Sequence, residues 1–221
     1  MTTPHAALAN IACPYCGGQF AQPPGRKRKC PRCGNTVFVK STPQNRTKRL
    51  MTEGDANEAE RQWAAYHLRQ ESLQALQPFG LTETDLKREI ALGHTERDAL
   101  SVLLQRVATE TSNLHLRKMA YYSLAICADK EGRPFSELLR QAVRCQLLRF
   151  KQSGVRRVAI LTSAPSRACS ECGALANRVL DIDVAINLMP LPCPTCTGTL
   201  FSENPGFCRC SYVPDLSNLG A

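Results

Sequence analysis

The sequence lacks the features that place a protein in a membrane or export it. No apolar stretch in its 221 residues approaches the ~18 uncharged residues that a membrane-spanning helix needs, and the longest, residues 119–128, is far shorter. Residues 1–5 show neither the basic start nor the apolar segment of a signal peptide. We therefore expect a cytoplasmic protein with no membrane partner. In that reducing compartment, clustered cysteines bind metal more often than they form disulfides.

Catalytic signatures are equally scarce. The sequence has no phosphate-binding glycine loop, no H-E-x-x-H motif and no nucleophile elbow. Residues 161–221 contain no histidine, which argues against an HNH-type nuclease because that chemistry needs a catalytic histidine beside cysteine-bound zinc. We therefore predict that the protein is not an enzyme, and we assign no catalytic residue.

Acidic residues are absent from the beginning of the chain. Residues 1–50 hold nine lysines and arginines and no acid, so this segment carries the whole formal net charge of +9, and the charges of the rest cancel. A solvated surface usually mixes charges of both signs. The single sign here favours a polyanionic partner, and we predict that this partner is nucleic acid, either DNA or RNA.

Cysteine is abundant, and its spacing in the basic segment is typical of a metal site. Two C-P-x-C-G turns stand thirteen residues apart and supply four thiolates: Cys13, Cys16, Cys30 and Cys33. The proline in each turn fixes φ, and the glycine permits a left-handed exit from the turn. Four thiolates suit tetrahedral Zn²⁺, which would supply folding free energy to a segment with few large apolar residues.

Residues 11–40 resemble the zinc-ribbon family in this pair of cysteine turns. The resemblance implies that the turns lie on β-hairpins, with Phe20 and residues 36–39 in short strands. Between the turns, a Pro-Pro-Gly loop would project four consecutive cations. The candidate nucleic-acid-binding residues are Tyr15, Arg26, Lys27, Arg28, Lys29, Arg32 and Lys40. The tyrosine would stack on a base while the cations contact phosphate. Zinc ribbons also bind proteins, so an uncommitted basic surface or a protein-docking ribbon is the alternative.

Residues 55–154 have the pattern of a helical domain, with apolar residues at helical spacing. Three Thr-x-x-Asp capping boxes begin predicted helices, at Thr52, Thr82 and Thr95. Residues 155–161 then read as a strand. Cys127 and Cys145 fall on apolar helix faces, and we interpret them as core thiols rather than ligands.

Six further cysteines lie within 42 residues of one another: Cys169, Cys172, Cys193, Cys196, Cys208 and Cys210. Two C-x-x-C turns twenty residues apart would supply four ligands to a second Zn²⁺. The C-x-C pair complicates the assignment, because extended backbone places both of its sulfurs on one face. Either Cys208 or Cys210 can therefore replace a thiol of the turns, and the ligand set stays open.

The same region resembles the C-terminal part of phage head morphogenesis proteins of the Mu F type. The resemblance covers residues 155–214 and rests on a C-x-x-C pair, a Pro-Leu-Pro segment and the ending Cys-Arg-Cys-Ser-Tyr-Val-Pro. This sequence departs from the pattern by lacking a histidine just before Cys-Arg-Cys and by adding Cys193 or Cys196. The ligands that the resemblance implies are Cys169, Cys172, Cys196 and Cys208, with Cys193 and Cys210 as alternates.

Together these patterns predict a mixed, mainly α protein in four segments. They are a basic β zinc ribbon at 1–41, a linker at 42–54, a helical domain at 55–154 and a small cysteine-rich α+β zinc module at 155–221. We predict two zinc sites and nucleic-acid binding through the ribbon. The alternative is a structural or assembly protein of phage or prophage type that acts through protein–protein contacts.

Overall fold

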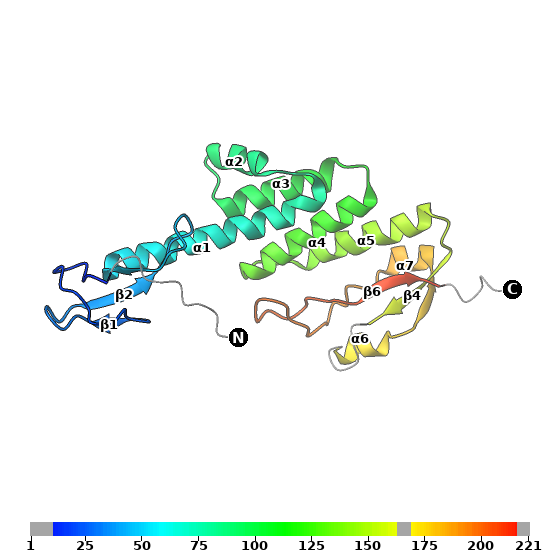
Figure 1. The fold of residues 1–221 in the computed structure, drawn as a ribbon. Coiled ribbons are helices and arrows are strands. Elements are labelled where there is room, and N and C mark those ends of the chain that lie inside the picture. The colour runs from blue at the N-terminus through cyan, green and yellow to red at the C-terminus, as the bar shows by residue number, and fades with distance from the viewer. Residues whose placement is uncertain (1–10, 163–168, 216–221) are drawn as a thin grey trace, which may run out of the picture. The chain divides into compact units, whose positions relative to one another are not determined.

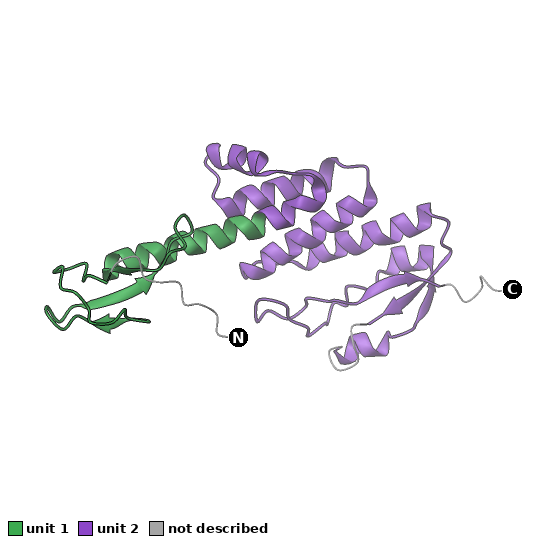
Figure 2. Ribbon diagram, viewed as in Figure 1, with its two compact units in different colours: residues 1–72 green, residues 73–221 purple. Residues whose placement is uncertain are grey.

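The chain divides into two units at a point within its longest helix, α1 (Glu53–Leu76). The computed structural model describes residues 11–162 and 169–215; unit 1 is residues 1–72 and unit 2 is residues 73–221 (Figure 2). The fold mixes helices and strands, as predicted, and it is about half helical, with a small antiparallel sheet and a cysteine cluster in each unit. The division does not coincide with a predicted boundary, so the four-segment layout stays a prediction. No helix in the described residues is long and apolar enough to cross a membrane.

Unit 1 contains a three-stranded antiparallel sheet that leads into α1 (Figure 1). The strands β1 (Arg28–Lys29), β2 (Thr36–Lys40) and β3 (Arg49–Met51) are ordered β1-β2-β3, so β2 is central. Strand β3 lies in the segment expected to be a linker. It pairs there because Leu50 and Met51 are buried, which a free linker would not require.

Alternation along β2 sends neighbouring side chains to opposite faces of the sheet. Val37 packs in a cluster that includes Cys13, Cys30 and the buried Phe20. Phe38 packs instead against a cluster formed by β3 and the first turns of α1. Phe20 was expected in a strand, but it follows an isolated bridge between residues 12 and 19 and lies outside the named strands.

Four helices form most of unit 2: α2 (Glu83–Ala91), α3 (Glu96–Glu110), α4 (Leu114–Lys130) and α5 (Ser136–Gln152). The predicted caps are confirmed, because Thr82 forms a capping box with Asp85 and the Thr95 side chain accepts from the Asp98 N–H. Helices α2, α3, α4 and α5 pack successively in sequence order, around a buried leucine-rich core (Figure 1).

A second antiparallel sheet completes unit 2. Strand β4 (Arg157–Leu161) lies between β5 (Val179–Asp181) and β6 (Ser211–Pro214). The short helices α6 (Ser170–Ala174) and α7 (Ile182–Leu188) flank β5 in the sequence. Helix α5 packs against α7 and β6. Gln146 of α5 is buried and donates from Nε2 to the carbonyl of Tyr212 at 2.7 Å, which fixes β6 to the helix.

A buried acid ties the cysteine-bearing loop to α4. The Asp129 carboxylate accepts from the N–H of Phe201 at 2.8 Å, and it also accepts from the N–H and the hydroxyl of Ser202. Burial alone would raise the pKa of Asp129, but the bonds from Ser202 and Phe201 outweigh it and lower the pKa. This anchor restrains the segment that separates Cys196 from Cys208.

Candidate metal centres

The four cysteines of unit 1 meet in one cluster, as their spacing predicts. Their Sγ atoms all lie within 4.8 Å of one another. The sulfurs of Cys13 and Cys33 are 3.8 Å apart, and those of Cys16 and Cys30 are 3.7 Å apart. Zinc–sulfur bonds of about 2.3 Å in a tetrahedron give edges of about 3.8 Å, whereas a disulfide is about 2.05 Å long. All four cysteines are free thiols, so the cluster fits a tetrahedral ion and not a pair of disulfides.

The turns that carry these sulfurs have the expected backbone. Gly17 and Gly34 adopt φ values of 69° and 74°, and each donates its N–H to the carbonyl of the first cysteine in its turn. This left-handed conformation is the reason for glycine at both positions. The N–H of Arg32 also points to the Cys30 sulfur at 3.4 Å, which stabilises a thiolate there.

The thiols of unit 1 perturb one another strongly. The N–H of Cys33, together with that of Arg32, lowers the pKa of the Cys30 thiol to about 6 despite its burial. For Cys33 the N–H of Asn35 acts in the same direction, but burial and the neighbouring sulfurs outweigh it and raise the pKa to about 11. Neighbouring thiolates repel one another, so the last thiol ionises only at high pH. A divalent cation removes that penalty, and the four residues present therefore suit Zn²⁺.

Five of the six C-terminal cysteines also come together, in two groups that share Cys172. One group holds Cys169, Cys172 and Cys196, and the other holds Cys172, Cys208 and Cys210. Within each group the sulfurs lie within 4.8 Å of one another, and the Cys172–Cys208 distance is 3.7 Å. Both sulfurs of the C-x-C pair reach Cys172, as extended backbone predicts.

Cys193 is the exception among the predicted ligands. Among the described residues it joins neither group, although its side chain is buried. Its Sγ lies 3.5 Å from the Thr195 hydroxyl, and its backbone N–H interacts with the Cys208 sulfur. The main chain of Cys193 thus contacts the cluster while its thiol lies elsewhere.

Burial dominates the acid–base behaviour of the C-terminal thiols. It raises the pKa of Cys208 to about 12, and burial together with the surrounding sulfurs also raises the pKa of Cys172. Cys169 differs: burial opposes ionisation, but the N–H groups of Cys172 and Thr197 outweigh it and lower the pKa of Cys169 to about 7. Without a cation most of this cluster stays protonated at neutral pH, and a bound metal would reverse that.

The predicted nucleic-acid-binding residues divide into free and engaged side chains. Arg26, Arg28, Lys29 and Arg32 are exposed, and none has an ion-pair partner among the described residues. Lys27 lies with its Nζ 5.6 Å from the centroid of the Phe38 ring, a cation–π distance.

Tyr15 and Lys40 make contacts with the start of α1 instead. The Tyr15 hydroxyl accepts from the N–H of Glu53 at 2.9 Å, while its ring remains partly exposed. Lys40 forms an ion pair with Glu60 at 2.7 Å. A phosphate would have to compete with that carboxylate for Lys40.

A group of aromatic side chains on α1 was not among the predicted site residues. Trp63 stacks on His67 with ring centroids 5.4 Å apart and meets Tyr66 edge-on at 5.7 Å. Its Nε1–H donates to the carbonyl of Ser41 at 2.8 Å, and the Tyr66 hydroxyl lies 3.5 Å from Nη2 of Arg46. The signal for this group in the sequence is the spacing of three aromatic rings at i, i+3 and i+4, about one helical turn, which equally predicts an ordinary packing face.

Comparisons of this chain with family models, with curated proteins and with solved structures found no match. The two resemblances described in the sequence analysis therefore rest on short sequence motifs alone.

Proposed function

We propose that the protein binds two structural zinc ions and that the first organises a zinc ribbon which binds nucleic acid. The support for the first ion is the close approach of four sulfurs at near-tetrahedral distances, and the support for the second is two groups of three close sulfurs that share Cys172. Four-sulfur coordination leaves no open position for a water or a substrate. We therefore propose that both ions are structural and that the protein has no enzymatic activity.

The proposed ligands of the second ion are Cys169, Cys172, Cys196 and Cys208. The first three form one of the two close groups, and Cys208 is the thiol at tetrahedral distance from Cys172. Cys210 is then a spare thiol beside the ion, and it is the alternative fourth ligand.

The main support for nucleic-acid binding is positive charge in unit 1 that no acidic side chain pairs with among the described residues. The acidic residues of unit 1 all lie on α1, where Glu58 pairs with Arg61 and Glu60 pairs with Lys40. The cations of the loop and of β1 are left without such partners among the described residues. A phosphate backbone would replace their counterions, and the aromatic ring of Tyr15 or Trp63 can stack on an unpaired base.

Fluorescence anisotropy with labelled single-stranded DNA, duplex DNA and single-stranded RNA tests this function. Binding through four phosphate contacts predicts that the logarithm of the affinity falls with the logarithm of salt concentration with a slope of about −3 to −4. The double variant R28Q/K29Q should reduce that slope by about 2. Arg61→Gln is the matched control, because Arg61 lies in the same unit and its charge is already paired with Glu58. Absence of binding by the zinc-loaded protein at low salt would refute the proposal.

A second candidate function is assembly through protein contacts, as the phage-type alternative requires. Val184 and Leu188 lie one turn apart on α7 and are 42% and 68% exposed. Paired exposed apolar residues favour an interface. Sedimentation analysis of the wild type and of V184D/L188D tests it: a defined oligomer that the variant abolishes supports assembly, and a monomer at all concentrations opposes self-assembly.

A further inference from the structure

A cavity of about 370 Å³ lies in unit 2 between α4, α5 and residues 208–211, which lead into β6. We call it the α4–α5 cavity. Its volume falls within the range of about 300–1,000 Å³ that is typical of sites for small molecules. Its lining includes the largely apolar side chains of Met119 and Tyr122 of α4 and Val143 of α5, which we call the apolar wall.

The charges at this cavity have one sign. Lys118 of α4 and Arg209 line it, and no acidic residue of the described part of the chain does. Neither cation has an ion-pair partner among the described residues. Lys118 is only partly exposed. Its burial, and to a smaller extent the nearby charge of Arg149, lowers the pKa of its ammonium group. Two cations therefore lie at the cavity with no carboxylate among its lining residues, which favours the binding of an anion.

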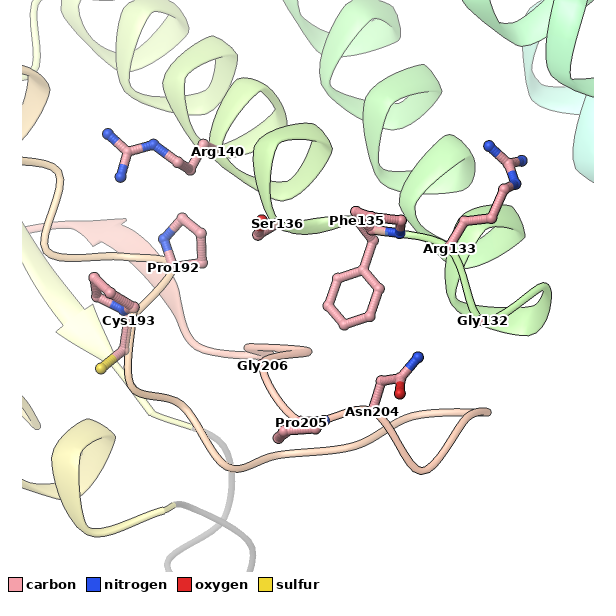
Figure 3. Close-up of a pocket in the computed structure, with 12 residues that line it drawn as sticks. Gly132, Arg133, Phe135, Ser136, Arg140, Pro192, Cys193, Asn204, Pro205 and Gly206 are labelled. Atoms are coloured by element: carbon pink, nitrogen blue, oxygen red, sulfur yellow. The ribbon is translucent and has the colours of Figure 1, made fainter.

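A second cavity in unit 2 shows the contrast. It has a volume of about 460 Å³ and is also lined by two cations, Arg133 and Arg140 (Figure 3). There Arg133 pairs with Glu131 at 2.5 Å, and Arg140 lies 3.8 Å from the carboxylate of Glu137. Figure 3 shows the two guanidinium groups on opposite sides of Phe135. The charges of that cavity are compensated and separated, so it offers no comparable anion site.

The metal centre is the other possible reason for free cations at the α4–α5 cavity. Cys208 and Cys210 line the cavity as well, and a zinc ion with four thiolates carries a net charge of −2. Charge balance alone, however, does not require a cavity of this volume or a wall of Met119, Tyr122 and Val143. The apolar wall and the cations together match a molecule that has both an apolar body and a charged head.

We propose that the α4–α5 cavity binds a small organic anion whose carboxylate or phosphate head contacts Lys118 and Arg209 and whose apolar body packs on Met119, Tyr122 and Val143. This site is independent of nucleic-acid binding by unit 1, since all of its residues belong to unit 2.

The test uses the full-length, zinc-loaded protein and the fluorescent probe anilinonaphthalene sulfonate, with neutral N-phenylnaphthylamine as its uncharged counterpart. The proposal expects saturable binding of the sulfonate that weakens at least about tenfold in K118M or R209M, the loss of one charge-assisted hydrogen bond. Binding of the neutral dye should change little. The control is K87M, because Lys87 lies on α2 and is paired with Glu83. Equal sulfonate affinity in the wild type and the K118M/R209M double variant would overturn the proposal.

Two further measurements distinguish an anion-binding site from cations that only balance the charge of the metal centre. Displacement of the probe by octanoate or by phenyl phosphate supports the site and identifies its preferred head group, and displacement by neither contradicts it. Zinc content is measured on the same variants. If K118M and R209M lose zinc while the probe affinity stays unchanged, the cations serve the metal centre and the proposal is wrong.

Discussion

The Sγ atoms of Cys172 and Cys208 lie 3.7 Å apart, although thirty-six positions separate them in the sequence. Cys172 belongs to α6, and Cys208 precedes β6, the strand that pairs with β4. One ion bound by both thiolates would therefore close a long loop of the chain. Closure of this kind stabilises a fold by restricting its unfolded state.

The geometry predicts that serine substitutions in unit 2 divide the cysteines into ligands and bystanders. Cys172→Ser should release the C-terminal ion because Cys172 belongs to both close groups. Cys193→Ser should retain it because the Cys193 sulfur joins neither. Between the alternates, C208S should weaken zinc retention more than C210S. Zinc release during chelator titration measures all four variants, and equal retention by C172S and C193S would show that the assignment is wrong.

Metal removal should affect the two units differently. The core of α2, α3 and α4 contains Leu86, Leu103 and Leu104 and no predicted ligand, so helical circular dichroism should persist after chelation. Unit 1 should lose its sheet, because Cys13 and Cys30 lie at the centre of its small core. Trp63 is the sole tryptophan and reports on unit 1 by fluorescence. Part of α1 belongs to unit 1, so a partial decrease of the helical signal is expected with the fluorescence change, whereas loss of most of the helical signal would contradict independent units.

Two substitutions of Tyr15 distinguish the structural role of its hydroxyl from the nucleic-acid-binding role of its ring. Tyr15→Phe removes the acceptor for the Glu53 N–H but keeps the ring. It should lower the free energy of unfolding by about 0.5–1.5 kcal/mol, measured by Trp63 fluorescence during denaturation. Its affinity for single-stranded nucleic acid should stay near that of the wild type. Tyr15→Leu removes the ring as well and should weaken binding. If Y15F and Y15L bind equally well, the ring does not stack on a base.

Asp129 should make the stability of unit 2 depend on acid pH. Its folded pKa lies below the unfolded value of about 3.9, so its contribution is fully present above that value and is lost as pH falls through the folded pKa. Asp129→Asn should cost about 1–3 kcal/mol at neutral pH, and the difference from the wild type should shrink below about pH 4. Denaturant titrations at several pH values measure this, with the exposed Glu137→Gln as control. A difference that stays constant with pH would exclude the carboxylate as its source.

Local rules account for the parts that could be predicted from the sequence. Proline and glycine define the turns at Cys13 and Cys30, so the meeting of four sulfurs was predictable from spacing. The caps at Thr82 and Thr95 likewise depend on residues three positions away.

Contacts between distant segments account for what sequence reasoning missed. The pairing of Lys40 with Glu60 and the bond from Glu53 to Tyr15 depend on how α1 lies against the sheet of unit 1. The orientation of Cys193 depends on how its turn packs against the segment around Cys208, which a C-x-x-C spacing alone does not encode.

Native mass spectrometry of the intact chain tests the central claim most directly, because it counts bound ions in each folded species. The account predicts two zinc ions in the wild type and one in each of Cys13→Ser and Cys172→Ser. It predicts none in the double variant. A single ion in the wild type, or the loss of both ions from Cys13→Ser alone, would contradict two independent metal centres.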